Sequence, residues 1–129
     1  MDLITITRDN GLEFKIRVRG HCVSSDMSES DGGADGGPSP AELLGVSLGA
    51  CTAMMAQRYC ERHGWEGDAG VSLTLELADN PKRVGRIVVD LELPAGVPDD
   101  KREAVKQVAG RCLVHETLRR PPAVDVEVA

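Results

Sequence analysis

The chain has 129 residues, a formal net charge of −6 and only 2% aromatic residues. This length predicts one domain over residues 1–129, and it suffices for a hydrophobic core that needs no disulfide or metal. The acidic balance argues against nucleic acid as a partner. The sequence does not open with a secretory leader, and its apolar runs are shorter than the ~20 residues of a membrane span, so we expect a cytoplasmic protein with no membrane partner.

The N-terminal part of the chain is predicted to form a β-hairpin followed by a loop. Apolar and polar residues alternate over 2–8 and 12–20, on both sides of Asn10-Gly11, a dipeptide typical of two-residue hairpin turns. Residues 24–37 are polar, acidic and rich in glycine. This composition predicts a mobile loop within the domain.

A long helix is predicted over residues 40–63. Ser39 and Glu42 have the spacing of a capping box, and Gly64 follows at the position where helices commonly end. Residues 43–56 contain no charge, so we expect this half of the helix to be buried on every side. The second half is polar and is expected to reach the surface.

In the rest of the chain, apolar and polar residues alternate again, and two helices are predicted after them. A second hairpin is predicted from the alternation in 71–78 and 84–93. Two short helices are predicted at 98–110 and 111–120, followed by a closing strand at 123–128. The element order ββ-α-ββ-αα-β indicates an α+β fold with antiparallel sheet.

Four cysteines are the main candidates for chemistry. Cys51 and Cys60 are nine residues apart, which places them on opposite sides of the predicted helix at ~100° per residue. Cys60, near the polar end of the helix, and Cys22, after the first hairpin, are expected to have no chemical role. Cys51 is either a small core residue or a nucleophile kept away from water. Cys112 is predicted to begin a helix, where a thiolate is stabilised, so the residues alone favour Cys112 as the more reactive thiol.

His115 follows Cys112 at a spacing that puts both residues on one helix face. Its ring either favours the thiolate as an imidazolium or forms a hydrogen bond in the core. No second Cys/His pair has zinc spacing, so a structural zinc site is not expected.

Two segments together resemble a known family: "GPSPAELLGVSLGACTAMMAQRYCERHGW" (37–65) and "RCLVHETL" (111–118). They are similar to the OsmC/Ohr family of osmotically inducible and organic hydroperoxide resistance proteins, and most similar to its OsmC-like branch. The resemblance covers the whole chain. It implies an intertwined homodimer in which antiparallel sheets pack on long central helices, with two active sites at the subunit interface.

The resemblance also implies roles for individual residues. By the family pattern, Cys51 is the peroxidatic thiol and Cys112 the resolving thiol. Arg8, in the first hairpin, corresponds to an arginine that supports the thiolate, and Glu42 to a glutamate near the start of the helix. In the better characterised members that glutamate directly follows the proline, where this chain has Ala41, and a proline follows the second cysteine, where this chain has Leu113.

The activity that the resemblance implies is reduction of organic hydroperoxides to alcohols in oxidative-stress defence. The route passes through a sulfenic acid on Cys51 and a Cys51–Cys112 disulfide, which an external dithiol or lipoyl-type reductant then reduces. It needs no metal, haem or flavin. The alternative is a non-catalytic dimer of the same fold that binds a small apolar ligand or partner. Ala41 favours this alternative, and the paired cysteines favour the enzyme.

Overall fold

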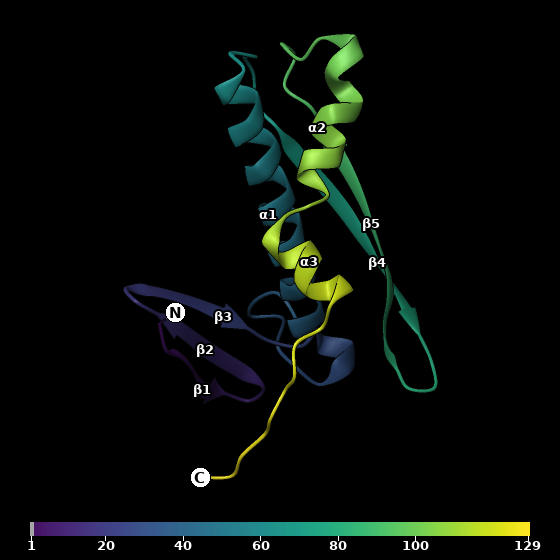
Figure 1. The fold of residues 1–129 in the computed structure, drawn as a ribbon. Coiled ribbons are helices and arrows are strands. Elements are labelled where there is room, and N and C mark those ends of the chain that lie inside the picture. Colours follow the sequence, from purple (N-terminus) through teal and green to yellow (C-terminus); the bar gives the residue numbers. More distant parts are fainter. Residues whose placement is uncertain (1) are drawn as a thin grey trace. The chain divides into compact units, whose positions relative to one another are not determined.

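The computed structural model describes residues 2–129 (Figure 1). The chain divides into two compact units, the first ending at Gly45 and the second running from Val46 to Ala129. The long helix α1 (Pro40–Arg62) begins in the first unit and continues in the second. The expectation of one domain over residues 1–129 stays a prediction.

The first unit contains a three-stranded antiparallel sheet in the order β1-β2-β3. Its strands are β1 (Ile4–Asn10), β2 (Glu13–Val18) and β3 (His21–Ser25). The predicted hairpin is confirmed, but its turn is shifted by one residue. Asn10 pairs with Glu13, so Gly11 and Leu12 form the turn, and Gly11 adopts a left-handed φ of 56°.

The third strand was not predicted, because apolar and polar residues alternate over 12–20 as in a single strand. Val18 pairs instead with His21, so the chain reverses at Arg19-Gly20. Arg19 has a positive φ of 55°, which is uncommon for a residue with a side chain and gives a weak signal in the sequence.

The segment after β3 is a loop, as predicted over 24–37, and its mobility stays a prediction. It contains a short 3-10 helix, η1 (Glu29–Asp31). The carboxylate of Asp26, only 2% exposed, accepts hydrogen bonds from the backbone N–H groups of Met27, Ala34 and Gly36 at 2.7, 3.2 and 2.9 Å. One buried side chain therefore holds the loop in place.

Both predicted ends of α1 are confirmed to within one residue. At the start, Ser39 N donates to Glu42 Oε1 at 2.9 Å and Glu42 N donates to Ser39 Oγ at 3.2 Å, which is a complete capping box. At the end, Gly64 has a φ of 71°, the left-handed conformation that commonly terminates helices. Burial on every side is not observed in the single chain, since Val46 and Met54 are 56% and 67% exposed.

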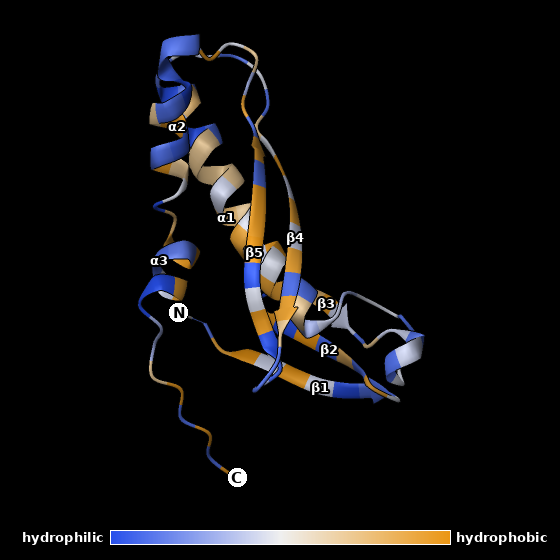
Figure 2. Cartoon of the chain, turned by 90° about the vertical axis from the view of Figure 1, so that its right-hand side faces the viewer, coloured by the Kyte–Doolittle hydropathy of each residue, from blue (hydrophilic) through white to orange (hydrophobic). Residues whose placement is uncertain are grey.

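The second unit contains a long antiparallel hairpin of β4 (Gly70–Ala78) and β5 (Arg83–Glu92), which confirms the predicted pair. Apolar and polar residues alternate along both strands (Figure 2). Gly49 of α1 packs closely on β4: a Cβ at this position would lie 2.9 Å from Leu73 Cδ2 and 3.3 Å from Val71 Cγ1. The absence of a side chain at Gly49 therefore allows the helix to approach the hairpin.

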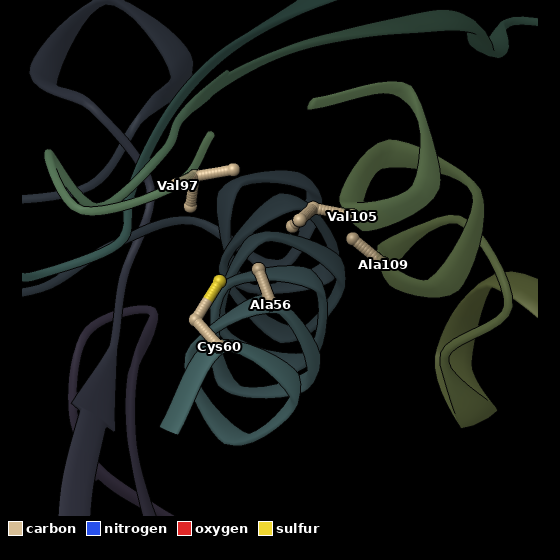
Figure 3. Packing of buried hydrophobic residues seen from close by; sticks show 5 residues of the cluster. All are labelled: Ala56, Cys60, Val97, Val105 and Ala109. Atoms are coloured by element: carbon tan, nitrogen blue, oxygen red, sulfur yellow. The ribbon is translucent and has the colours of Figure 1, made fainter. Parts of the chain in front are cut away.

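Two short helices complete the second unit. A 3-10 turn, η2 (Asp99–Lys101), leads into α2 (Arg102–Ala109), and α3 (Leu113–Arg119) follows. These confirm the two predicted helices with slightly shorter bounds. A buried cluster joins α1 to α2 and to the loop after β5 (Figure 3), and its members are Ala56, Cys60, Val97, Val105 and Ala109.

The predicted closing strand at 123–128 is wrong for the single chain. This segment has no regular secondary structure, and Val124, Val126 and Val128 are 80%, 89% and 97% exposed. A strand forms only where its backbone groups pair with a neighbour, and alternation in the sequence does not supply that neighbour. The predicted α+β class with antiparallel sheets is confirmed, in the observed order βββ-α-ββ-αα. Within residues 2–129, no helix is both long and apolar enough to cross a membrane.

Candidate active site

Cys112 lies at the junction of α2 and α3, where it caps α3. Its backbone is extended (φ −67°, ψ 157°), and its Sγ accepts a hydrogen bond from the backbone N–H of His115 at 3.4 Å. The residue has no exposed surface. The donor to the sulfur is the backbone amide of His115, and both roles considered for its imidazole ring stay predictions.

Thr52 of α1 is the second partner of this sulfur. Its Oγ1 lies 3.8 Å from Cys112 Sγ and 2.8 Å from the carbonyl oxygen of Leu48, to which it donates. A hydroxyl has one proton and two lone pairs. The Thr52 hydroxyl donates its proton to the Leu48 carbonyl, so its oxygen can accept the S–H of Cys112. Thr52 is 7% exposed, so this contact is shielded from water.

Cys51 directly precedes Thr52 on α1 and is partly exposed. Cys112 packs on α1 against Thr52. The Cα atoms of Cys51 and Thr52 are about 3.8 Å apart, as in any pair of consecutive residues. The structure therefore brings Cys112 to the part of the helix where the sequence places the other candidate thiol. All four cysteines are free thiols. The peroxidatic and resolving roles stay predictions.

The sequence did not predict Thr52 as a residue of the site. A threonine inside a helix commonly donates to the carbonyl four residues earlier, as Thr52 does to Leu48. Its position next to Cys51 was the only signal, and nothing in the sequence placed Cys112 beside it.

The other two cysteines have different surroundings. Cys60 is fully buried in the cluster of Figure 3, and this burial raises the pKa of its thiol. Its expected position near the surface is wrong, because the polar half of α1 is covered by Val97 and α2 on this side. A buried neutral thiol among aliphatic side chains is unreactive, which supports the expectation of no chemical role. Cys22 is exposed on β3.

Arg8 and Glu42 both have structural partners within the first unit. Arg8 Nε donates to the carbonyl oxygen of Gly11 at 2.8 Å, across the hairpin turn. The carboxylate of Glu42 takes part in the capping box, and the backbone N–H of Ser39 is the main cause that lowers its pKa. A role for either side chain beside Cys51 stays a prediction.

A pocket of about 190 Å³ opens beside Thr52 within the second unit, and we call it the Thr52 pocket. It lies where α1, β5, α2 and α3 meet. Its lining residues are Leu48, Thr52, Ile87, Val89, Leu91, Lys106, Ala109, Gly110 and His115. Across residues 2–129, no group of three or more His, Cys, Asp or Glu side chains is placed to hold a metal ion.

Comparison with known families identifies the chain. Residues 32–127 match the family model described as OsmC-like protein, so the chain belongs to the OsmC family. This confirms the resemblance seen in the two cysteine-containing segments. The search of curated proteins gave no match.

Solved structures share the fold at low sequence identity. A protein from Psychrobacter arcticus 273-4, named for osmotic stress induction and a detoxification response, has a TM-score of 0.83 and 18% identity over 91% of this chain and 88% of its own. The organic hydroperoxide resistance protein OsmC from Legionella pneumophila has a TM-score of 0.68 and 16% identity over 92% and 89%. A Vibrio cholerae protein named for organic hydroperoxide resistance, solved with captopril in one of its active sites, has a TM-score of 0.63 and 17% identity over 92% and 85%.

Proposed function

We propose that this protein is a thiol-dependent reductase of organic hydroperoxides that acts in oxidative-stress defence, with Cys51 as the peroxidatic and Cys112 as the resolving thiol. The observation that carries the proposal is the contact between Cys112 Sγ and Thr52 Oγ1, because Thr52 directly follows Cys51 in α1. Membership of the OsmC family and the names of the Legionella and Vibrio structures support a redox role.

The reaction divides into three balanced steps. The Cys51 thiolate attacks one oxygen of ROOH, the O–O bond breaks, and RO⁻ takes up a proton and leaves as the alcohol while Cys51 becomes a sulfenic acid. Cys112 then attacks the sulfur of that acid, which forms a disulfide and releases water. An external dithiol or lipoyl-type reductant returns both cysteines to thiols by exchange and is itself oxidised to a disulfide.

The surroundings of the two thiols support this order of events. Cys51 is partly exposed, so a hydroperoxide can reach it, whereas Cys112 is fully buried. The Cys112 sulfur shares a hydrogen bond with Thr52 and accepts one from the His115 backbone. Disulfide formation requires Cα atoms within about 7 Å and takes the Cys112 sulfur out of its cap position. The burial of Cys112 and the exposure of Cys51 therefore support a resolving role for Cys112, against the order expected from the helix N-terminus alone.

A homodimer is part of the proposal because the single chain leaves large apolar side chains uncovered. Val46 and Met54 on α1 are exposed, as is Leu113 at 76%. The alternating tail at 123–128 also lacks a partner strand. Large exposed apolar side chains favour an interface with another chain, so a second copy is expected to cover them. Light scattering should give twice the mass of the chain at micromolar concentration, and a stable monomer would contradict the dimer.

The decisive experiment treats the reduced protein with cumene hydroperoxide and follows its thiols by mass spectrometry. The wild type should form an intrachain 51–112 disulfide. Cys112→Ser should stop at a trappable sulfenic acid on Cys51, and Cys51→Ser should not react. Cys60→Ser is the matched control and should behave like the wild type. A faster reaction at Cys112 than at Cys51 would reverse the assigned roles.

A second candidate function is a non-catalytic dimer that binds a small apolar ligand. It is favoured by an apolar hollow of about 410 Å³ within the first unit, lined by residues that include Ile6, Phe14, Ile16 and Leu43. Ala41 at the position of the family glutamate points the same way. In this case no thiol of the protein would react with cumene hydroperoxide faster than a free cysteine peptide.

A further inference from the structure

The surface formed by α2, α3 and the turn between them carries a concentration of positive charge. A hollow of about 420 Å³ is present here, and we call it the basic hollow. Its lining residues are Lys106, Gln107, Gly110, Arg111, His115 and Arg119. Three of the six are permanent cations and none is acidic, although the chain as a whole has a net charge of −6.

Helix ends explain only part of this arrangement. Lys106 and Arg119 lie in the last turns of α2 and α3, where cations are favourable against the helix dipole. Arg119 is also paired with Glu116, at 3.8 Å. Within residues 2–129, however, neither Lys106 nor Arg111 forms an ion pair with an acidic side chain. Two cations are therefore available to an external anion.

The basic hollow adjoins the Thr52 pocket, because Lys106, Gly110 and His115 line both. Most of the other residues that line the Thr52 pocket are apolar, and they are Leu48, Ile87, Val89, Leu91 and Ala109. Its volume of about 190 Å³ is roughly six times the ~30 Å³ that one water occupies in the liquid. A space of this size suits a short alkyl chain.

We propose that the basic hollow and the Thr52 pocket together form a binding site for a monocarboxylate with a short alkyl chain. The carboxylate lies between Lys106 and Arg111, and the chain extends into the apolar pocket toward Thr52. Charge complementarity selects the anionic head, and the apolar walls select the tail. This site follows from the geometry of α1, β5, α2 and α3 and does not depend on the thiol chemistry.

The binding test compares three probes with the same chain and different heads: octanoate, 1-octanol and octylamine. Amide chemical shifts of the intact protein locate the site and give the affinities. Octanoate should shift Gly110 and His115 and bind about tenfold more tightly than octanol, while octylamine should bind more weakly than either. From butanoate upward, each added methylene should increase affinity about three- to fourfold until the pocket is filled.

Two variants separate the proposal from non-specific binding. Lys106→Gln combined with Arg111→Gln should lower octanoate affinity about tenfold and leave octanol affinity unchanged. Lys101→Gln, which removes an exposed cation outside the hollow, should change neither. The proposal is overturned if octanoate and octanol bind equally, if the shifts lie elsewhere, if Lys101→Gln weakens octanoate as much as the double variant, or if octanoate does not bind at millimolar concentration.

Discussion

Replacing Thr52 with valine removes one hydroxyl from the proposed site while keeping the shape of the side chain. The hydroxyl makes two contacts, at 2.8 Å to the Leu48 carbonyl and at 3.8 Å to Cys112 Sγ. Loss of one modest internal hydrogen bond costs about 1 kcal/mol of the free energy of unfolding. For a chain of this size we therefore expect the melting temperature to fall by about 3–5 °C.

The larger effect is expected on disulfide formation. Cys112 attacks as a thiolate, and the Thr52 hydroxyl can rotate to donate to that sulfur alongside the His115 N–H. A hydrogen bond to a charged group contributes about 1.5–3 kcal/mol, and the 3.8 Å contact favours the lower end. Thr52→Val should thus slow the resolving step about tenfold, with little change in the reaction of Cys51 with peroxide.

Stopped-flow mixing with cumene hydroperoxide, followed by trapping of the sulfenic acid, separates the two steps. Thr52→Val should accumulate the sulfenic acid of Cys51 and show more sulfinic acid at excess peroxide. Thr52→Ser keeps the hydroxyl and should restore a nearly normal resolving rate. If the serine variant is as slow as the valine variant, packing and not the hydroxyl controls the step. An unchanged rate in Thr52→Val would refute the role of Thr52 altogether.

Three further variants test the packing and the buried carboxylate. Cys60→Ser should leave peroxide-dependent disulfide formation intact but lower the free energy of unfolding by about 1–2 kcal/mol in urea titrations, because it buries a hydroxyl among aliphatic side chains. Gly49→Val should cost about 1–3 kcal/mol in the same assay, since its Cβ would lie 2.9 Å from Leu73 Cδ2, and an unchanged midpoint would show that α1 is not tightly packed on β4. Asp26→Asn should be less stable than the wild type at neutral pH. The hydrogen bond from the Gly36 N–H is the main cause that lowers the pKa of Asp26 below its usual ~3.9. The wild type's advantage in the free energy of unfolding is therefore present above that value and disappears as the pH falls through the folded-state pKa. A stability advantage of the wild type that persists at pH 2 would contradict this.

Local patterns in the sequence were sufficient to locate most helices and strands. The capping box at Ser39 and Glu42 and the left-handed Gly64 depend on residues within one turn of helix, so the ends of α1 were correct to within one residue. Alternation located both hairpins but not their exact turns. β3 was missed because Arg19-Gly20 is a weak turn signal inside an alternating stretch.

The candidate site was only partly accessible from the sequence. Cys51 and Cys112 were selected from a family resemblance, while the helix dipole argument favoured Cys112 as the more reactive thiol. The dipole argument considers the helix end alone. It omits Thr52, which is 60 residues away in the chain and reaches the same sulfur. It also could not show that Cys112 is completely buried.

The amino-acid sequence by itself determined the α+β class, the long helix with its caps and the family. The class and the helix depend on period, composition and contacts between residues close in the chain, whereas the family followed from the resemblance of two cysteine-containing segments. Tertiary structure alone decided that Cys60 is a core residue, that Thr52 touches Cys112, and that the alternating segment 123–128 is not a strand in the single chain. Burial and strand pairing are set by neighbours distant in sequence, and a local pattern shows that a face is apolar without showing what covers it.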